Sequence, residues 1–337
     1  MSSAENVALI KTRFIGDEAV AAAADWPSII AALRAAYGGE VTPEMVPNRS
    51  MARGKGFWLR GLSAVSPSGK YMGCKLIAAS PKAKRASYLI PLFDQKTMDL
   101  AALIDGNRIT GYRTAGTAVV AIELLAKDEP LTVAIIGSGY ESRGLFEALL
   151  SSRGVAEARV FSPTPANRER YASDFAASHG VSMRAAASAE EAVLGANLIL
   201  CAARSHDESP TLKGAWLSPG AVVVSLGSTL QEQREVDEET LARAALIVAD
   251  MPEEVLHETG DAIAATKAGI ALEAKIVSLG DLASGKVRRP DDPAAITIYK
   301  SVGSALQDIV IAEMILERAS IAGQYFEMPE SIHTIIK

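Results

Sequence analysis

The chain has 337 residues, of which 49% are hydrophobic and 22% charged, so it is long enough for two domains and too apolar for a disordered protein. A net charge of −6 and a pI near 5.4 argue against nucleic acid and anionic membranes as partners. Cys74 and Cys201 stand in apolar sequence without metal-ligand spacing, which indicates a reducing compartment and no metal site. The N-terminus lacks an export pattern and no apolar run is long enough to span a membrane, so we expect a cytoplasmic protein.

The first part of the chain predicts a helix followed by an antiparallel sheet. Residues 10–37 carry apolar side chains at helical spacing. Two apolar runs, 58–62 and 88–93, lie between turns rich in Gly, Pro, Ser and Lys and predict strands. Residues 114–126 then predict a helix of small residues that leads into the middle of the chain.

The middle of the chain begins with the clearest strand. Residues 131–136 are rich in β-branched side chains and lie between Pro130 and Gly137, as a buried parallel strand does. A helix over 142–152 and a strand over 158–161 follow. This strand–helix–strand order is typical of a parallel sheet.

The same alternation continues down the chain. Thr164-Pro165 is an N-cap followed by a first-turn proline and opens a helix to about His179. Residues 188–191 form a capping box for another helix. Further strands are expected at 198–202, 221–226 and 246–249. These elements predict an α/β fold, a Rossmann doubly wound parallel sheet with helices on both faces.

The end of the chain predicts a long amphipathic helix over 302–319 that returns to the first domain. We therefore expect a Rossmann domain over 115–308. Residues 1–114 and 309–337 are expected to form a second, α+β domain built from both chain ends.

A glycine loop follows the first strand of the predicted Rossmann sheet. The first glycine permits a tight turn, the second lets backbone N–H groups approach a pyrophosphate, and the helix N-terminus adds partial positive charge. Ser142 stands where a third Gly or Ala is usual, and the pattern does not explain Glu141. The sequence predicts that NAD(P) is bound by Gly137, Ser138, Gly139, Tyr140, Glu141 and Ser142.

The second strand ends without the carboxylate that would hold the ribose 2′-hydroxyl of NAD. Hydroxyls at Ser162 and Thr164, with Arg168 one turn further on, slightly favour NADP(H). The alternative is that residues 162–165 only form a turn and a helix cap.

Arg49, Lys75 and Arg113 are candidate substrate ligands in the first domain. Lys75 lies inside an apolar, strand-like run, where a lysine needs an interaction partner or has a functional role. Arg113 precedes the helix expected at 114, a usual place for an anion site. Taken singly, each of these cations also fits an ordinary solvated surface position.

These segments together resemble the ornithine cyclodeaminase/mu-crystallin family over nearly the whole chain. The most specific are the Arg-Thr-Ala segment and the Val-Gly…Gln-Asp segment. The matching segments are Val46–Arg49, Gly73–Lys75, Leu92–Asp94, Ile109–Ala115, Gly137–Gly139, Leu217–Gly220, Arg234–Asp237 and Ser301–Asp308.

The resemblance implies that the domain of both chain ends forms a homodimer and binds substrate, while the Rossmann domain binds NAD(P). It implies that Arg49 and Arg113 hold a substrate α-carboxylate. It also implies that Lys75 polarises or protonates the reacting carbon–nitrogen centre, with a pKa lowered by like charge and desolvation. Further cofactor contacts are expected from Thr114, Ala202, Gly227, Ser228, Val302 and Gly303.

One departure from the family pattern bears on the reaction. Cyclodeaminases carry an aspartate where this chain has Thr229, whose hydroxyl cannot accept a proton near neutral pH. Residues 86–88 also lack the family's Gly-Leu-Pro. We therefore expect no ornithine cyclodeaminase activity, and an NAD(P)H-dependent reductase of the C=N bond of an α-imino acid or cyclic ketimine. A redox-neutral cyclodeaminase and a non-catalytic, NADPH-dependent binding protein of mu-crystallin type remain the alternatives.

Overall fold

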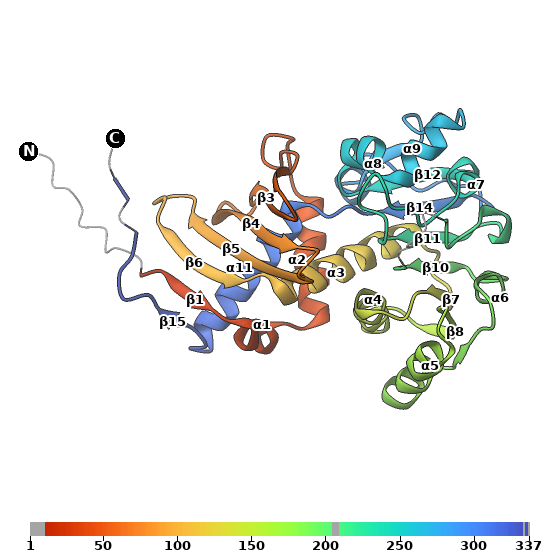
Figure 1. Cartoon of the computed structure of the whole chain (residues 1–337), viewed down its shortest axis with the longest axis horizontal. Helices are drawn as coiled ribbons and strands as arrows, with labels where there is room; N and C mark the ends of the chain where they lie inside the picture. The colour runs from red at the N-terminus through yellow and green to blue at the C-terminus, as the bar shows by residue number, and fades with distance from the viewer. Residues whose placement is uncertain (1–10, 204–208, 333, 336–337) are drawn as a thin grey trace, which may run out of the picture. The chain divides into compact units, whose positions relative to one another are not determined.

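The computed structural model describes residues 11–203, 209–332 and 334–335 (Figure 1). The chain divides into two compact units: unit 1 is Met1–Arg113 with Ser304–Lys337, and unit 2 is Thr114–Gly303. The expected boundaries, 114/115 and 308/309, differ from these by one and five residues. The second boundary lies earlier because Ser304 is the N-cap of the C-terminal helix, so the whole helix belongs to unit 1.

The described part of unit 1 contains a seven-stranded sheet in the order β15-β1-β6-β5-β4-β3-β2. Neighbouring strands are antiparallel, as expected, except that β1 and β6 are parallel. Because β15 pairs with β1, the two ends of the chain meet in one sheet. The strands are β1 (Arg13–Ile15), β2 (Ser50–Gly54), β3 (Phe57–Val65), β4 (Tyr71–Ser80), β5 (Arg85–Asp94), β6 (Leu100–Asp105) and β15 (Phe326–Glu327).

Helix α11 (Ala305–Ile321) packs against β3, β4 and β5 and contacts α1 (Asp17–Ala23) and α2 (Trp26–Gly38). The expectation of one helix over 10–37 is wrong. Asp25 caps α2 by accepting a hydrogen bond from Ser28 N, and Pro27 in its first turn cannot continue the preceding helix. No single described helix has the length and hydropathy to cross a membrane. Helices α1 and α2 meet that test only as a pair bent by 85°.

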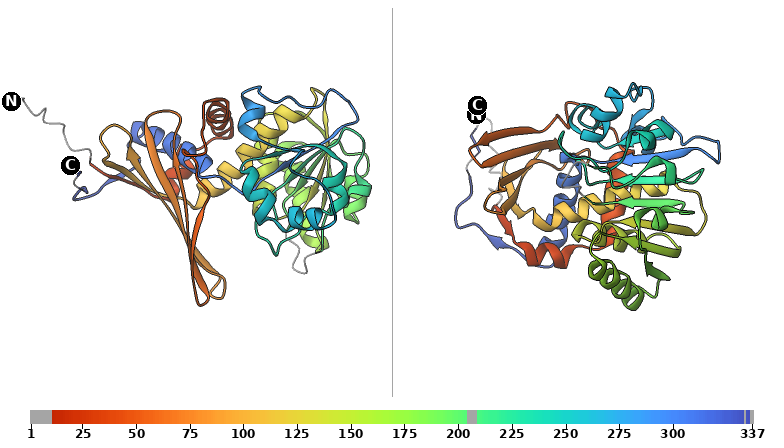
Figure 2. Two further views of the ribbon diagram at one scale, coloured as in Figure 1. Left: turned by 90° about the horizontal axis from the view of Figure 1, so that it is seen from above. Right: turned by 45° about the vertical axis from the view of Figure 1, so that its right-hand side comes forward.

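The described part of unit 2 contains an eight-stranded sheet in the order β13-β12-β14-β11-β10-β7-β8-β9. Figure 2 shows the ribbon from two further sides. All of its neighbouring strands are parallel, which confirms the α/β doubly wound fold. The strand order reverses at β7, which lies between β8 and β10. The strands are β7 (Leu131–Ile136), β8 (Val155–Phe161), β9 (Met183–Ala185), β10 (Leu198–Cys201), β11 (Val222–Ser225), β12 (Ala244–Ala249), β13 (Ile276–Ser278) and β14 (Ile296–Lys300).

The helices of unit 2 follow the predicted alternation. Helix α4 begins at Tyr140 rather than 142 because Gly139 is its N-cap, and Ser188 caps α6 as expected by accepting from Glu191 N. The helices are α4 (Tyr140–Leu150), α5 (Pro165–His179), α6 (Ala189–Val193), α7 (Glu238–Arg243), α8 (Pro252–Glu258), α9 (Gly260–Lys267) and α10 (Leu279–Ala283), with a short 3₁₀ turn, η1 (Gly214–Trp216).

Helix α3 (Asn107–Leu125) begins seven residues before the expected start and contains the boundary between the units. The prediction that Arg113 precedes a helix is therefore wrong, because Arg113 lies in the second turn of α3. The side chain of Asp105 accepts a hydrogen bond from Asn107 N and so satisfies the true helix start. Burial of Ile109 at the start of the helix outweighs the low helix propensity of Gly111.

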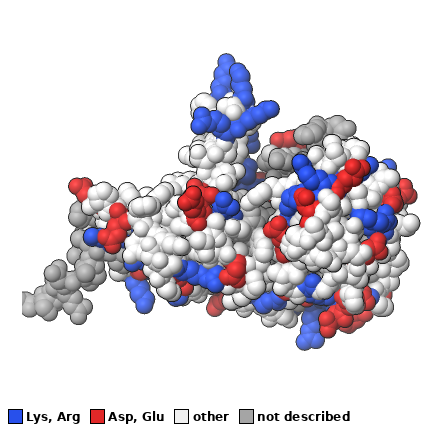
Figure 3. Space-filling view, turned by 90° about the horizontal axis from the view of Figure 1, so that it is seen from below, with Lys and Arg blue, Asp and Glu red and all other residues white. Residues whose placement is uncertain are grey.

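The negative net charge is not spread evenly over the chain. Residues 50–88 contain no Asp or Glu. Figure 3 shows Lys and Arg side chains gathered on a projecting part of the surface. Exposed cations lie at the ends of the β2–β3 and β4–β5 hairpins: Arg53, Lys55, Lys82, Lys84 and Arg85. The surface at these hairpin ends is therefore positive although the whole chain is negative.

Candidate active site

A buried ion pair joins the sheet of unit 1 to α11. Lys75 lies in the middle of β4 and is 1% exposed, and its Nζ is 2.8 Å from Asp308 Oδ1. Asp308 belongs to the first turn of α11 and is fully buried. A buried ammonium needs such a counter-charge, because burial alone strongly disfavours the charged form.

Arg113 shares the same carboxylate. Its Nε is 3.3 Å from Asp308 Oδ1, and its Nη1 donates to Gln307 Oε1 over 3.0 Å. Gln307 Nε2 in turn donates to Tyr37 Oη. The other carboxylate oxygen, Asp308 Oδ2, is buried and accepts no hydrogen bond from any described residue. The cluster therefore contains two cations and one acceptor oxygen that no described residue uses.

The pKa of Lys75 is lowered to about 8, mainly by burial; Asp308 opposes this shift, and the positive charges of Arg113 and Arg60 add to it. The expected direction of this shift is confirmed. Arg60 is, with Arg113, one of the two arginines that lower this pKa. Its guanidinium lies 5.1 Å from the centroid of the Trp58 ring. A lysine with a pKa near 8 can give up or take a proton near neutral pH.

Arg49 lies one residue before β2 and is half-buried. In the strand ladder, Ser50 pairs with Gly61, and Leu62 pairs with Lys75. Continuing this register by one residue places Arg49 opposite Leu62, on the same face of the sheet as Lys75 and two strands away, or about 10 Å.

Sequence reasoning did not select four residues of this cluster: Tyr37, Arg60, Gln307 and Asp308. The pair Gln307-Asp308 lies within one of the family-like segments, but its contact with Lys75 spans 233 positions in the sequence. No spacing rule detects a partner at that separation. The available signal is a carboxylate directly before the apolar run 309–312 of a helix, where a buried charge needs a counter-ion.

The glycine loop of unit 2 has room for a phosphate. Gly137 has φ +112°, and a Cβ at this position would lie 2.8 Å from Ala202 O, so only glycine fits. Gly139 is the N-cap of α4 and supplies no side-chain cap, and a Cβ added there would meet nothing within 4 Å. The start of α4 therefore has no side-chain cap and has open space beside Gly139, which suits the pyrophosphate of a dinucleotide.

Ser142 supports this loop from inside. It is 1% exposed, its Oγ donates to Gly137 O over 2.8 Å, and Tyr171 Oη donates to Ser142 O. The serine that replaces the usual third Gly or Ala thus braces the turn. Its loop neighbours Tyr140 and Glu141 are exposed.

The residues expected at the adenosine end come together after β8. Ser162 Oγ lies 2.9 Å from Ser138 Oγ of the glycine loop. Arg168 Nη1 donates to Ser162 O over 2.8 Å, and its guanidinium lies 5.3 Å from the centroid of the Phe161 ring. Thr164 is the exposed N-cap of α5. This group contains the hydroxyls of Ser162 and Thr164 and a guanidinium, that of Arg168, held by a hydrogen bond.

The remaining predicted cofactor residues lie at other strand ends, except Thr114, which is half-buried in α3. Ala202 and Gly227 follow β10 and β11, and Ser228 Oγ donates to Gln233 O. The backbone N–H groups of Val302 and Gly303 donate to the two carboxylate oxygens of Asp250 at the end of β12.

Thr229 occupies the position where cyclodeaminases carry an aspartate. Its N–H donates to Gln233 Oε1 over 3.0 Å. Glu232, the nearest carboxylate along the sequence, is exposed. Buried Glu235 contacts the start of this loop, where it accepts from Gly227 N.

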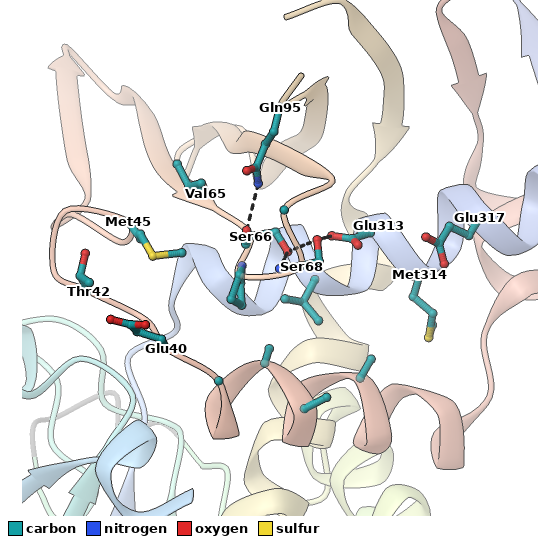
Figure 4. A pocket seen from close by; sticks show the side chains of 17 residues that line it. Glu40, Thr42, Met45, Val65, Ser66, Ser68, Gln95, Glu313, Met314 and Glu317 are labelled. Carbon is teal, nitrogen blue, oxygen red and sulfur yellow. Dashed lines mark hydrogen bonds between the residues drawn. The ribbon is translucent and has the colours of Figure 1, made fainter. Parts of the chain in front are cut away.

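A cavity of about 760 Å³ lies in unit 1 beside α2 and α11 (Figure 4). Its polar side contains Ser68 Oγ, which donates to Glu313 Oε2, and Gln95 Nε2, which donates to Ser66 O. Lys75 and Arg113 do not line it, so it is separate from the lysine cluster. Among the residues that the structure describes, no cluster of His, Cys, Asp and Glu is arranged to hold a metal ion.

The fold and these clusters define a two-unit protein of the Rossmann type. The profile of the ornithine cyclodeaminase/mu-crystallin family matches residues 11–323, and the chain belongs to this family. It is 32% identical over 226 residues to the ketimine reductase mu-crystallin of Mus musculus, which is 67% of each protein. It is 27% identical over 254 residues to a Delta(1)-pyrroline-2-carboxylate reductase of Bacillus cereus, covering 74% of this chain and 77% of that protein.

Structural similarity extends over both units. The structure of Thermococcus litoralis Delta(1)-pyrroline-2-carboxylate reductase in complex with NADH and L-proline has a TM-score of 0.86 to this chain. It is 25% identical in sequence, and the match covers 94% of this chain and 100% of the other.

The Lys75–Asp308 pair generates a pH-dependent stability prediction. Asp308→Asn removes the counter-charge and lowers the pKa of Lys75 below 8. The variant should lose about 3 kcal/mol of unfolding free energy at pH 6, measured by urea denaturation. The loss should be smaller at pH 9, because Lys75 is then neutral with or without the carboxylate.

The control is Asp25→Asn, which keeps the helix cap and weakens only the exposed contact with Arg318. It should cost less than about 1 kcal/mol at both pH values. An equal loss for Asp308→Asn at pH 6 and pH 9 would show that Asp308 does not govern the proton on Lys75.

Proposed function

We propose that the protein is an NAD(P)H-dependent reductase of the C=N bond of an α-imino acid or cyclic ketimine, giving an amino acid. The observation that carries this proposal is the buried cluster of Lys75, Arg113 and Asp308, with one carboxylate oxygen that no described residue uses. The two relatives named above are reductases of such bonds: a ketimine reductase and a pyrroline-2-carboxylate reductase.

The residues of unit 1 suit an imino acid. Arg113 and Arg49 present guanidinium groups that match a planar carboxylate in a bidentate manner. Lys75 lies on the same face of the sheet as Arg49 and shares Asp308 with Arg113, and it supplies the proton that the imine nitrogen needs. Asp308 Oδ2 is an acceptor for the N–H group of the substrate.

The residues of unit 2 suit the cofactor. The open N-terminus of α4 and the glycine loop hold a pyrophosphate, and Ser162 and Arg168 lie at the adenosine side. The bound dinucleotide supplies the hydride, which is chemistry that no protein side chain provides.

The experiment that tests the proposal follows oxidation of NADPH and NADH at 340 nm with a panel of substrates. The panel contains pyrroline-2-carboxylate, piperideine-2-carboxylate, and pyruvate or oxaloacetate with ammonia or methylamine. Turnover with at least one member is expected. Binding of NAD(P)H without oxidation on any member would favour the binding-protein alternative, and ammonia release from L-ornithine with catalytic NAD⁺ would favour the cyclodeaminase.

Lys75 generates the sharpest prediction about the reaction. In the reductive direction, kcat/KM should fall as pH rises through about 8, because the neutral amine cannot donate a proton. Lys75→Ala should lose at least about a hundredfold in turnover and keep its NAD(P)H affinity. Lys75→Arg keeps the positive charge but cannot release its proton, so it should lose turnover with a nearly unchanged KM. A folded Lys75→Ala protein with wild-type turnover would contradict the assignment.

We further propose a preference for NADPH over NADH. Arg168 is held at the end of β8 beside Ser162 and Thr164, and residues 158–168 contain no carboxylate to repel a 2′-phosphate. Arg168→Ala should weaken NADPH binding about tenfold and change NADH binding less than about twofold, measured by nicotinamide fluorescence. Arg170→Ala, on the same helix and exposed, is the matched control. Tighter binding of NADH than of NADPH to the wild type would contradict the preference.

A homodimer is also proposed, through the face of the unit 1 sheet opposite α11. The register places Leu59, Leu76, Leu89 and Phe14 on this face, and Leu59 is 48% exposed. An apolar sheet face of this kind is covered in a stable protein, and a second copy supplies a matching surface.

Light scattering after size exclusion should give twice the monomer mass for the wild type. Leu59→Asp should give a monomer, since a carboxylate cannot be buried against the apolar face of the second copy. Leu194→Asp, at an exposed leucine of unit 2, should remain dimeric. A dimeric Leu59→Asp protein would place the interface elsewhere.

A further inference from the structure

A buried carboxylate in unit 2 ties together the ends of two neighbouring strands. Glu235 is 0% exposed. Its Oε1 accepts a hydrogen bond from Ala203 N over 3.0 Å, and its Oε2 accepts from Gly227 N over 2.9 Å and from Ser225 Oγ over 2.6 Å. Because Ala203 follows β10 and Gly227 follows β11, one side chain fixes both strand ends.

Other charged side chains hold Glu235 itself in place. Lys300 Nζ, from the end of β14, donates to Ser225 Oγ and to Asp261 Oδ2, both over 2.8 Å, and to Ser228 O over 3.1 Å. Asp261 Oδ1 accepts from the backbone N–H of Glu235 over 2.8 Å. The network therefore connects β10, β11, β14 and α9, and a buried network with satisfied partners is rigid.

The packing around Gly227 leaves no space for a side chain. A Cβ on Gly227 would lie 2.3 Å from Glu235 Oε1 and 2.6 Å from Ala203 O. The carboxylate thus touches the backbone directly. In Rossmann sheets, the carboxyl ends of the strands beside the reversal of strand order receive the dinucleotide, and β10 is the strand next to β7 at this reversal.

We propose that Glu235 is a positioning residue for the cofactor. It fixes the ends of β10 and β11 so that the backbone at Ala202, Gly227 and Ser228 has the geometry that the nicotinamide half of the dinucleotide needs. The inference rests on the proposed binding of NAD(P) by unit 2. It assigns Glu235 no contact with the substrate, because the side chain is 0% exposed and both of its oxygens are held by groups of the protein.

The network also predicts a pH dependence. Burial raises the pKa of Glu235 to about 7, with Asp261 of α9 raising it and Lys300 of β14, Ser225 Oγ and Gly227 N–H lowering it. Among the described residues, the Cys201 thiol of β10 and Arg234 of the same segment also lie near the network. Protonation of Glu235 adds an O–H hydrogen to a carboxyl group whose two oxygens already accept hydrogen bonds. The added hydrogen displaces one of these donors and so loosens the two strand ends. The affinity for NAD(P)H should therefore weaken as pH falls through about 7.

The test uses the full-length protein without substrate. Glu235→Gln keeps the size of the side chain but sets an NH₂ group against a backbone N–H. Its Kd for NAD(P)H, measured by nicotinamide fluorescence at pH 8, should be about tenfold higher than that of the wild type. Between pH 6 and 8 the variant's Kd should be flat, whereas that of the wild type should rise below about pH 7. At saturating cofactor, the KM for the imino acid should be unchanged.

The control is Asp237→Asn, two residues further along. Asp237 caps α7 by accepting from Thr240 N and does not touch either strand end, so its variant should bind NAD(P)H as the wild type does at every pH. If Glu235→Gln does not fold, Ser225→Ala replaces it. That variant should weaken binding about threefold and shift the pH midpoint upward, because it loses a hydrogen bond that favours the ionised carboxylate.

Wild-type affinity and wild-type pH dependence in Glu235→Gln, or in Ser225→Ala where that variant is used, would overturn the inference. An equal loss in Asp237→Asn would also overturn it, because the effect would then belong to the segment as a whole. A wild type that binds no NAD(P)H would contradict the proposed function instead, so the two failures are distinguishable.

Discussion

The ion pair between Lys75 and Asp308 is the constraint on which unit 1 depends. It joins a central strand to the first turn of α11 across 233 positions of sequence, and the same carboxylate also holds Arg113. Buried ion pairs add little net stability compared with well-packed apolar side chains. Retaining one here is therefore explained by chemistry, since it keeps a lysine whose pKa is near 8 inside the protein and beside an unused acceptor oxygen.

The two units use buried charge in opposite ways. In unit 1, Asp308 Oδ2 accepts no hydrogen bond from any described residue, so part of the cluster is free for a ligand. In unit 2, both oxygens of Glu235 are taken by backbone N–H groups and a hydroxyl, and Lys300 and Asp261 complete the network. The first arrangement suits proton transfer and binding. The arrangement around Glu235 suits a structural role, in which a side chain fixes the position of backbone atoms.

Local signals in the sequence were enough to predict the β7–α4–β8 unit, the cap of α6 and the parallel sheet, because each depends on residues within a few positions of one another. The same reasoning failed at 10–37, where the cap at Asp25 and the proline after it divide the helix. It also failed at Arg113, where buried apolar contacts extend α3 through a glycine. Asp308 and Glu235 were missed for another reason: a carboxylate reveals its role only through its partners, and theirs are brought in by the fold.

The pairing of β1 with β15 has a consequence for biosynthesis. Unit 2 is one continuous segment, whereas unit 1 needs Ser304–Lys337, which is synthesised after the whole of unit 2. Domains fold as units during synthesis, in the order in which their residues are complete. The Rossmann unit can therefore fold first, while the strand that carries Lys75 waits without its counter-ion and with its apolar faces uncovered. A nascent chain stalled before residue 304 would hold a complete unit 2 and an unfinished unit 1 with exposed apolar surface.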